Sequence, residues 1–363
     1  MSAATYPVCT TGEAVAASLP ILKAAEYLVV DCEGENLGDR YGRLSLISIG
    51  AYGGSTPDIP HIFLYDATEL NHQTLTPILE VLSDPEILKV MWDGRMDFTE
   101  IYFSYGTTIE GVLDLQIAEI MSRGRRGETE RKRLERLATF FRPKALEENP
   151  EEYEQVQMVL GMQRCLEEHR LIRSPGEAKD RVCIFPFQPR TRWLTLAAML
   201  GLSSVVHFSI NAAAQMKGVF RNNAEQWMER PLGPDLLDYA IKDIHLINMI
   251  YRHFLIQSYL TRTKEMLEAS ERYISINSDL RMKPNRSDCY RSSPVLPLDI
   301  LEEPKGILYD CDGCQRELSL GCFHHTLWKR QKMCRVCRVV GLRKGRAVVD
   351  IKDKDSWVSI EIP

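Results

Sequence analysis

The sequence predicts an α/β fold, with a mixed five-stranded sheet flanked by helices and a small cysteine-rich module after it. Three features of the 363-residue chain predict this fold: three apolar, β-branched runs with short connections, then alternating helix and strand patterns, and five cysteines within the 27 residues 311–337. The composition, 44% hydrophobic and 26% charged, excludes a fibrous or wholly disordered chain. A net charge of −5 argues against a protein that coats DNA with basic residues.

Three strands are expected first. Residues 27–33 form an apolar run that ends in acids, residues 43–51 alternate along a second strand, and residues 61–65 form a third. Their connections are rich in Gly and Pro and short enough for antiparallel neighbours. A helix is expected before them, over residues 12–25.

Helices and strands then alternate, which implies a mixed sheet with helices on its faces. The expected elements are a helix over 74–82, a strand over 87–92, a helix over 96–105, a strand over 111–115 and a helix from 116. Further helical patterns cover residues 193–201, 235–256 and 261–282.

The chain is expected to divide into a main domain, a helix and linker, a metal-binding module and a tail. Their boundaries are 12–260, 261–305, 306–348 and 349–363. A charged, mostly helical insertion over residues 122–192 interrupts the main domain. It is either a solvated appendage or a basic arm over a substrate groove.

Three separate elements carry acids in positions that suit chemistry. Asp31 and Glu33 end the first strand, and residues two apart on a strand point to the same face. Asp97 opens the helix that follows the fourth strand. Tyr239 and Asp243 are four apart on a helix and therefore share a face. Divalent cations are the natural partners of such carboxylates, although each element alone has an ordinary structural explanation.

Taken together, these motifs resemble those of the DEDD superfamily of 3′–5′ exonucleases, which has a ribonuclease-H-like fold. Asp31-Cys-Glu33 resembles its first motif, Asp97 its second, and Tyr239-Ala-Ile-Lys-Asp243 its third, whose tyrosine indicates the tyrosine branch. Leu113-Asp-Leu-Gln-Ile-Ala118 resembles the family's Phe-Asp-Thr-Gln-x-Ala segment. Trp227-Met-Glu-Arg-Pro-Leu232 is similar to a segment of ribonuclease D-type and Egalitarian-type proteins.

The resemblance covers roughly residues 20–255 and implies phosphodiester hydrolysis with two Mg²⁺ or Mn²⁺ ions. It implies that Asp31, Glu33 and Asp243 hold the ion that binds the attacking water. Asp31 bridges to the second ion, Asp97 acts through that ion's water shell, and Tyr239 orients the water. The substrate is then the 3′ end of RNA or DNA, and the products are nucleoside 5′-monophosphates.

Two basic residues are candidates for substrate contact, each with a plain surface explanation as the alternative. Arg95 lies two residues before Asp97, and Lys217 lies ahead of the third motif.

One departure from the family's pattern is Trp92, where many Egalitarian-like members carry His. Since some members have lost activity, the alternative function is a catalytically inactive RNA-binding or adaptor protein.

The cysteines near the C-terminus have the spacing of a four-thiolate zinc site. Cys311-x2-Cys314 is followed, after nineteen residues, by Cys334-x2-Cys337. One structural Zn²⁺ would supply the folding energy of this short module. Spare ligands between the pairs are Cys322, His324 and His325.

The module also suggests a binding partner. Residues 311–347 contain nine Arg and Lys against two acids, and Phe323 and Trp328 are expected to be exposed, which suits nucleic acid. Docking of a protein partner is the alternative. The segment resembles zinc-ribbon-like tails of fungal exonuclease-domain proteins.

The expected compartment is intracellular, either nuclear or cytoplasmic. The N-terminus lacks a basic region followed by an apolar core, and no stretch of the sequence suits a membrane span.

Overall fold

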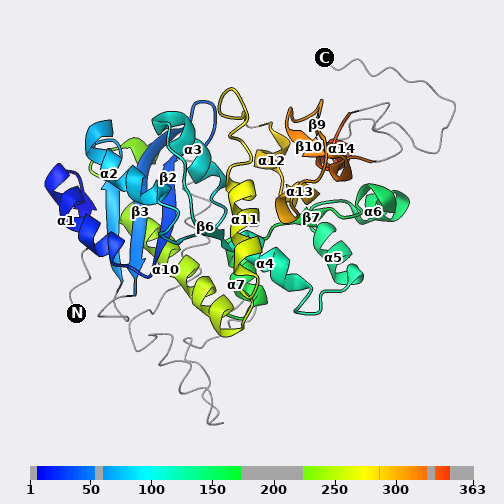
Figure 1. Ribbon diagram of the computed structural model, residues 1–363, viewed down its shortest axis with the longest axis horizontal. Helices are drawn as coiled ribbons and strands as arrows, with labels where there is room; N and C mark the ends of the chain where they lie inside the picture. The colour runs from blue at the N-terminus through cyan, green and yellow to red at the C-terminus, as the bar shows by residue number, and fades with distance from the viewer. Residues whose placement is uncertain (1–5, 54–59, 173–223, 286, 325–331, 344–363) are drawn as a thin grey trace, which may run out of the picture. The chain divides into compact units, whose positions relative to one another are not determined.

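The structure is a computed structural model that describes residues 6–53, 60–172, 224–285, 287–324 and 332–343 (Figure 1). The expected helix over 193–201 and the candidate residue Lys217 lie outside the described residues. Among the helices that are described, none is both long and apolar enough to cross a membrane.

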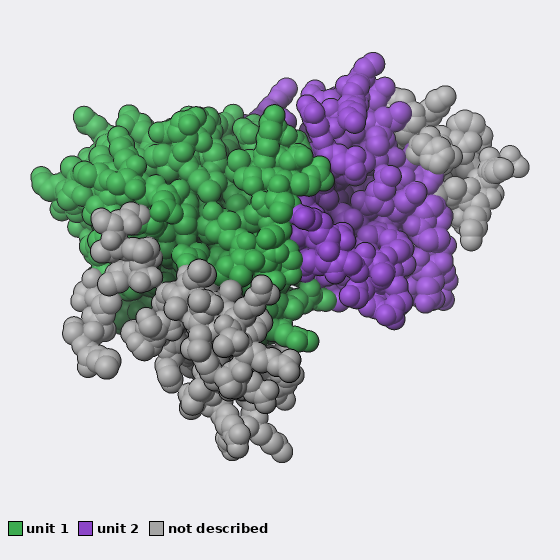
Figure 2. All heavy atoms as spheres, turned by 60° about the horizontal axis from the view of Figure 1, so that its bottom comes forward, with its two compact units in different colours: residues 1–119, 160–278 green, residues 120–159, 279–363 purple. Residues whose placement is uncertain are grey.

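The chain divides into two compact units, which are coloured separately in Figure 2. Unit 1 comprises Met1–Glu119 and Leu160–Ser278, and unit 2 comprises Ile120–Val159 and Asp279–Pro363.

A six-stranded mixed sheet forms the centre of unit 1. Its strands are β1 (Val8–Cys9), β2 (Tyr27–Glu35), β3 (Arg43–Tyr52), β4 (His61–Asp66), β5 (Lys89–Met91) and β6 (Val112–Asp114). The spatial order is β1-β4-β3-β2-β5-β6. The pairs β4–β3 and β3–β2 are antiparallel, whereas β1–β4, β2–β5 and β5–β6 are parallel.

Helices surround this sheet, most of them where the periodicity predicts them. They are α1 (Gly12–Lys23), α2 (His72–Ser83), α3 (Arg95–Tyr105), α4 (Leu115–Arg123), α7 (Met162–Glu168), α10 (Pro234–Ile256) and α11 (Thr263–Ile274), with a short 3-10 helix η3 (Ala224–Met228). Side chains of Thr11 and Asn71 accept hydrogen bonds from the first turns of α1 and α2, which explains where these helices begin.

The expected fold class is confirmed, with one strand more than expected. The five expected strands appear as β2 to β6, and the additional strand is the two-residue β1, which pairs with β4 at the edge. A two-residue strand carries no period-2 pattern, so nothing in the sequence distinguishes it from a loop.

Unit 2 is built from short elements. They are α5 (Glu130–Leu137), α6 (Pro143–Glu148), η1 (Pro150–Glu152), β7 (Gln157–Met158), α12 (Cys289–Ser292), β8 (Val295–Leu296), α13 (Leu298–Leu301), β9 (Leu308–Asp310), β10 (Glu317–Ser319), η4 (Leu320–Cys322) and α14 (Arg335–Arg343). Strands β9 and β10 form an antiparallel hairpin.

These units differ from the boundaries that the sequence suggests. Residues 122–159 were expected in the insertion, yet they fold with the C-terminal segment because β7 pairs with β8, a strand within the expected linker. The helix expected over 261–282 appears as α11 and belongs to unit 1, where the Ser270 hydroxyl accepts a hydrogen bond from the Asp114 amide at 2.9 Å.

A buried ion pair joins the two chain segments of unit 2. The Arg338 guanidinium donates through Nε and Nη2 to the two carboxylate oxygens of Glu152, and the side chains are 1% and 3% exposed. A paired arrangement of this kind satisfies both charges away from water.

Arg338→Met is therefore expected to destabilise the protein by about 3–5 kcal/mol, because it leaves the Glu152 carboxylate buried without its counter-charge. Urea unfolding followed by circular dichroism measures the effect, with the exposed Lys332→Met as the matched control. Adding Glu152→Gln to Arg338→Met should recover part of the loss. An Arg338→Met variant as stable as the control would contradict the assignment of residues 120–159 to unit 2.

Candidate active site

Strand β2 presents the first two acids of the site. Asp31 pairs with Ser48 and Glu33 with Leu46 in the antiparallel ladder with β3, so both acids point to one face of the sheet. A bulge follows between Glu33 and Gly34. A Cβ at Gly34 would lie 2.1 Å from the Arg43 carbonyl oxygen, so only glycine permits the strands to approach this closely.

Helix α10 brings the third acid. It packs against β2, β3 and β5 through a buried stripe that includes Ala240, Ile244 and Ile247 (Figure 1). Gly50 of β3 permits the approach, since a Cβ there would lie 2.6 Å from Ile244 Cγ2. Asp243 immediately precedes Ile244 and is carried to the sheet with it.

Three carboxylates meet at this point. Oxygens of Asp31, Glu33 and Asp243 all lie within 4.8 Å of one another, and the three residues are half-buried. Negative charges at this separation repel one another, and a divalent cation between them would remove the repulsion. The arrangement therefore has the donor chemistry of a Mg²⁺ or Mn²⁺ site.

Asp97 lies beside this group, in the first turn of α3. Its Oδ1 accepts a hydrogen bond from the backbone N–H of Cys32 at 3.1 Å, and Cys32 is the residue between Asp31 and Glu33. Burial first, and then the nearby Asp93 carboxylate, raise the pKa of Asp97 to about 7. The fourth acid is thus fixed to the same strand as the first two.

A hydrogen-bonded network holds the start of α3. The Asp114 carboxylate accepts from the backbone N–H of Gly94 at 2.8 Å and of Gln116 at 2.9 Å. Burial, followed by the Asp93 charge, raises the pKa of Asp114 to about 7. Asp114 and Gln116 belong to the segment 113–118, and the Asp114 carboxylate ties this segment to Gly94, the residue that precedes α3.

Arg95 takes part in this network. Its Nε donates to Asp93 Oδ1 at 2.6 Å, its Nη2 donates to Asp93 Oδ2 at 3.0 Å, and its guanidinium lies 4.8 Å from the centre of the Tyr273 ring. The residue is 5% exposed. The structure gives Arg95 internal partners, while its contact with substrate stays a prediction.

Tyr239 lies next to the three carboxylates. Burial raises the pKa of its phenol well above the usual range, and the charges of Asp243, Glu33 and Asp31 add to the effect. The phenol therefore remains protonated at neutral pH, when it can donate a hydrogen bond.

One further ion pair lies just before α10. Its acidic residue, Asp66, had no sequence signal that indicated it. Arg230, in the Trp-x-x-Arg-Pro-Leu segment before α10, donates to both carboxylate oxygens of Asp66 at 2.6 Å. It also donates to Ser45 Oγ at 3.0 Å, while the Ser45 hydroxyl donates to the carbonyl of Trp227. Arg230 and Asp66 are 164 positions apart, which no local pattern can report.

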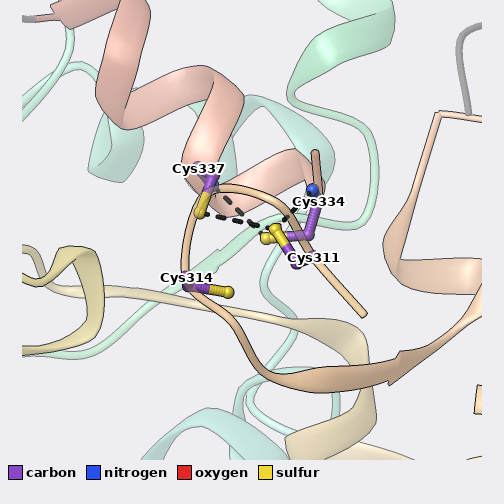
Figure 3. A group of neighbouring side chains, drawn as sticks. All are labelled: Cys311, Cys314, Cys334 and Cys337. Carbon is purple, nitrogen blue, oxygen red and sulfur yellow. Dashed lines mark hydrogen bonds between the residues drawn. The ribbon is translucent and has the colours of Figure 1, made fainter. Parts of the chain in front are cut away.

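The four-thiolate group is assembled in unit 2. Cys311 and Cys314 occupy the turn between β9 and β10, and Cys334 and Cys337 lie at the start of α14. Figure 3 shows their sulfurs turned toward one another, and all four Sγ atoms lie within 4.8 Å of one another.

Backbone amides also point at these sulfurs. The Cys334 N–H donates to Cys311 Sγ at 3.2 Å, and the Cys337 N–H donates to Cys334 Sγ at 3.4 Å (Figure 3). Such bonds stabilise thiolates. A Cβ at Gly313 would lie 2.9 Å from Cys337 Sγ, so the turn needs glycine there.

Several expectations for this module need correction. Phe323 is buried rather than exposed, because it forms a bridge with Cys334 in the interior of the module. Cys322 and His324 are buried, and neither belongs to the four-thiolate group that the described residues form. His325 and Trp328 lie outside the described residues.

The basic residues of the module are used differently from the expectation as well. Arg316 and Arg338 are buried in ion pairs with Asp288 and Glu152. A guanidinium engaged in this way contributes little to a phosphate-binding surface. These two residues therefore do not count among the basic residues that could contact nucleic acid.

Comparison with known proteins identifies the class of the main domain. Residues 6–140 match the family model described as a 3'-5' exonuclease. No curated protein matches the sequence significantly.

Among solved structures, RNase D of Trypanosoma brucei is 19% identical, with 86% of this chain and 85% of that chain covered and a TM-score of 0.45. Escherichia coli RNase D, an exoribonuclease involved in structured RNA processing, is 16% identical, with 74% and 51% covered and a TM-score of 0.37.

Residues 6–140 thus carry the match to a 3′–5′ exonuclease, and the expected resemblance is confirmed at that level. The protein is a nuclease of this class. The matched segment contains Asp31, Glu33 and Asp97, while Tyr239 and Asp243 lie beyond it and reach the site through α10.

Proposed function

We propose that the protein is a metal-dependent exonuclease that removes nucleotides from the 3′ end of a nucleic acid by a two-metal-ion mechanism. The products would be nucleoside 5′-monophosphates. One observation carries this proposal: carboxylates from β2 and α10 lie within 4.8 Å of one another, with Asp97 bound to the same stretch of β2.

The residues present fit two divalent cations. Asp31, Glu33 and Asp243 would hold one of them, since their oxygens already lie at mutual distances that suit a common ion. Asp31 would also contact the second, which Asp97 would hold through its water shell. Bound cations supply Lewis-acid stabilisation of the attacking and leaving oxygens in an in-line displacement.

The chain's own contribution is placement and charge. The antiparallel ladder fixes Asp31 and Glu33, and the close contact of Ile244 with β3 fixes Asp243. The network around Asp114 fixes the start of α3 and with it Asp97. Because these supports are rigid backbone elements, the acids need little rearrangement when substrate arrives.

Tyr239 would orient the attacking water. Its phenol stays protonated because of burial and neighbouring carboxylates, so it acts as a hydrogen-bond donor and not as a general base.

Tyr239→Phe should lower kcat by about 10²-fold while leaving KM and metal affinity nearly unchanged, because only the orienting hydroxyl is lost. Single-turnover assays at saturating Mg²⁺ or Mn²⁺ measure this. Tyr251→Phe is the matched control, since it lies on the same helix about 18 Å along the axis. Wild-type kcat in Tyr239→Phe would show that the hydroxyl has no part in the reaction.

The function is tested with RNA and DNA oligonucleotides that carry a 5′ label, with and without a chelator. A ladder shortened from the 3′ end, seen only with Mg²⁺ or Mn²⁺ present, is the expected result. Internal cuts would contradict the exonuclease proposal. Tight binding without turnover would favour the adaptor function, and comparison of the two polymers decides between RNA and DNA.

A structural Zn²⁺ in unit 2 completes the proposal. Four buried thiols within 4.8 Å, with amide N–H groups donating to two of them, fit the tetrahedral four-cysteine site typical of this ion. The folded module could present a surface to nucleic acid or to a protein partner.

A further inference from the structure

Five cysteines, and not four, converge at the thiolate group of unit 2. The fifth is Cys289 at the start of α12, a residue that lies 22 positions before Cys311 and belongs to neither Cys-x2-Cys pair. Its Sγ lies 3.5 Å from Cys337 Sγ. The Cys289 thiol also interacts with the thiol of Cys314.

This separation is that of two ligands on one metal. Zn–S bonds of about 2.3 Å in tetrahedral geometry place sulfurs about 3.8 Å apart. Within the four-thiolate group, Cys311 Sγ and Cys337 Sγ are 3.8 Å apart. The Cys289 sulfur is therefore at least as close to the Cys337 sulfur as the Cys311 sulfur is.

Helix α12 faces one particular side of the group. Cys289 contacts Cys337 and Cys314, and the hydroxyl of the next residue, Tyr290, lies 3.4 Å from Cys334 Sγ. These three thiols form the triangular face of the tetrahedron that lies opposite Cys311. A metal displaced through that face would exchange Cys311 for Cys289.

The position of Cys289 is held by its neighbours. The Asp288 side chain accepts from the backbone N–H groups of Tyr290 at 2.9 Å and of Arg291 at 3.2 Å, which fixes the first turn of α12. Arg316 donates to Asp288 at 3.0 Å, and its guanidinium lies 4.5 Å from the centre of the Tyr290 ring. Arg316 follows Cys314 by two residues, so α12 is tied directly to the cysteine turn.

We propose that Cys289 is a fifth metal-ligating thiolate of unit 2, which can replace Cys311 in a four-thiolate zinc site. The metal then has two ligand sets that share Cys314, Cys334 and Cys337. The inference rests on the zinc site proposed above. It means that the metal also binds residues expected to be a linker, and that zinc can change partners without leaving the protein.

Cobalt substitution in the full-length protein tests the proposal. Tetrahedral Co²⁺ bound to thiolates shows charge-transfer absorption whose intensity follows the number of sulfur ligands, whereas Co²⁺ on carboxylates shows none. We expect Cys311→Ser and Cys289→Ser each to keep the four-thiolate spectrum of the wild type. The double variant should lose about a quarter of the charge-transfer intensity, because three of the four thiolate ligands remain.

The matched control is the pair Cys311→Ser and Cys322→Ser, because Cys322 is a buried thiol of the same unit that lies outside the group. This control should keep the full spectrum. A Cys311→Ser variant that already has the three-thiolate spectrum would overturn the proposal. A wild-type protein without thiolate-bound cobalt would instead remove the zinc site itself.

A second measurement applies if Cys311→Ser fails to fold. A fifth thiolate assists ligand exchange, so zinc transfer to a chelator should be severalfold slower in Cys289→Ser than in the wild type, and unchanged in Cys322→Ser. Equal transfer rates for Cys289→Ser and the wild type would then overturn the proposal.

Discussion

Asp31→Asn is expected to abolish the exonuclease activity, with kcat lowered on the order of 10³-fold or more, or about 4 kcal/mol in the barrier. Asp31 lies within 4.8 Å of both Glu33 and Asp243, and it is the carboxylate proposed to contact both cations. Asparagine keeps the size of the side chain and removes the negative charge. The loss should therefore appear in catalysis and not in folding.

Two readouts separate these effects. The melting temperature of metal-free Asp31→Asn should equal or exceed that of the wild type, because one of three mutually repelling charges is gone. The increase in melting temperature on adding Mn²⁺ should be much smaller than in the wild type.

Asp238→Asn is the control, since this exposed carboxylate lies on the same helix as Asp243. An Asp31→Asn variant that still shortens RNA or DNA from the 3′ end at the wild-type rate would rule out the proposed carboxylate site.

Cys314→Ser is expected to weaken zinc binding and to destabilise unit 2. Cys314 belongs to both proposed ligand sets, so its loss leaves only three thiolates in each of them. Structural zinc contributes apparent binding energies of about 10 kcal/mol or more to small modules. Unit 2 also has an apolar core, which includes Tyr290, Ile300 and Phe323, so we expect a loss of stability and not complete unfolding.

The expected signs are loss of zinc to a chelator that leaves the wild type loaded, a lower midpoint for the unfolding of unit 2, and faster proteolysis within residues 287–324. Cys322→Ser, a buried cysteine outside the group, should leave all three unchanged. If Cys314→Ser keeps its zinc against the chelator and has wild-type resistance to protease, the four-thiolate site is not what stabilises this unit.

The strands of the main sheet were predictable because their signal is local. The run Tyr27-Leu-Val-Val is buried on both faces, and a short apolar, β-branched run of this kind indicates a central strand. The structure extends the expected strand to Glu35. The two extra residues, Gly34 and Glu35, carry no apolar side chain, and they pair only because β3 continues opposite them.

The short helices and strands of unit 2 could not be predicted in the same way. The second half of the expected helix and linker, residues 283–305, has four prolines and three serines, which favour a linker, yet it contains α12, β8 and α13. Each of these is only two to four residues long. Elements this short form through contacts with distant segments, such as β7, and not through their own periodicity.

The candidate site residues also divide into those that have a local sequence signal and those that have none. The acids Asp31, Glu33, Asp97 and Asp243 could be picked out by type and spacing, and the structure places them together. Phe323 was misjudged because an aromatic residue in a basic segment looks exposed until its burial is known. The spacing of the cysteines gives no reason to group Cys289 with the others, because proximity in space leaves no trace in spacing.

The sequence by itself determined the kinds of elements, the motif acids and the paired cysteines, since these depend on neighbours within a few residues. Tertiary structure alone decided which distant partners meet: Arg230 with Asp66, Arg338 with Glu152, and Cys289 with Cys337. The physical reason is the distance along the chain over which each kind of interaction acts. Backbone propensity and side-chain periodicity act over one or two turns, whereas ion pairs and thiolate groups depend on distances that only the folded chain defines.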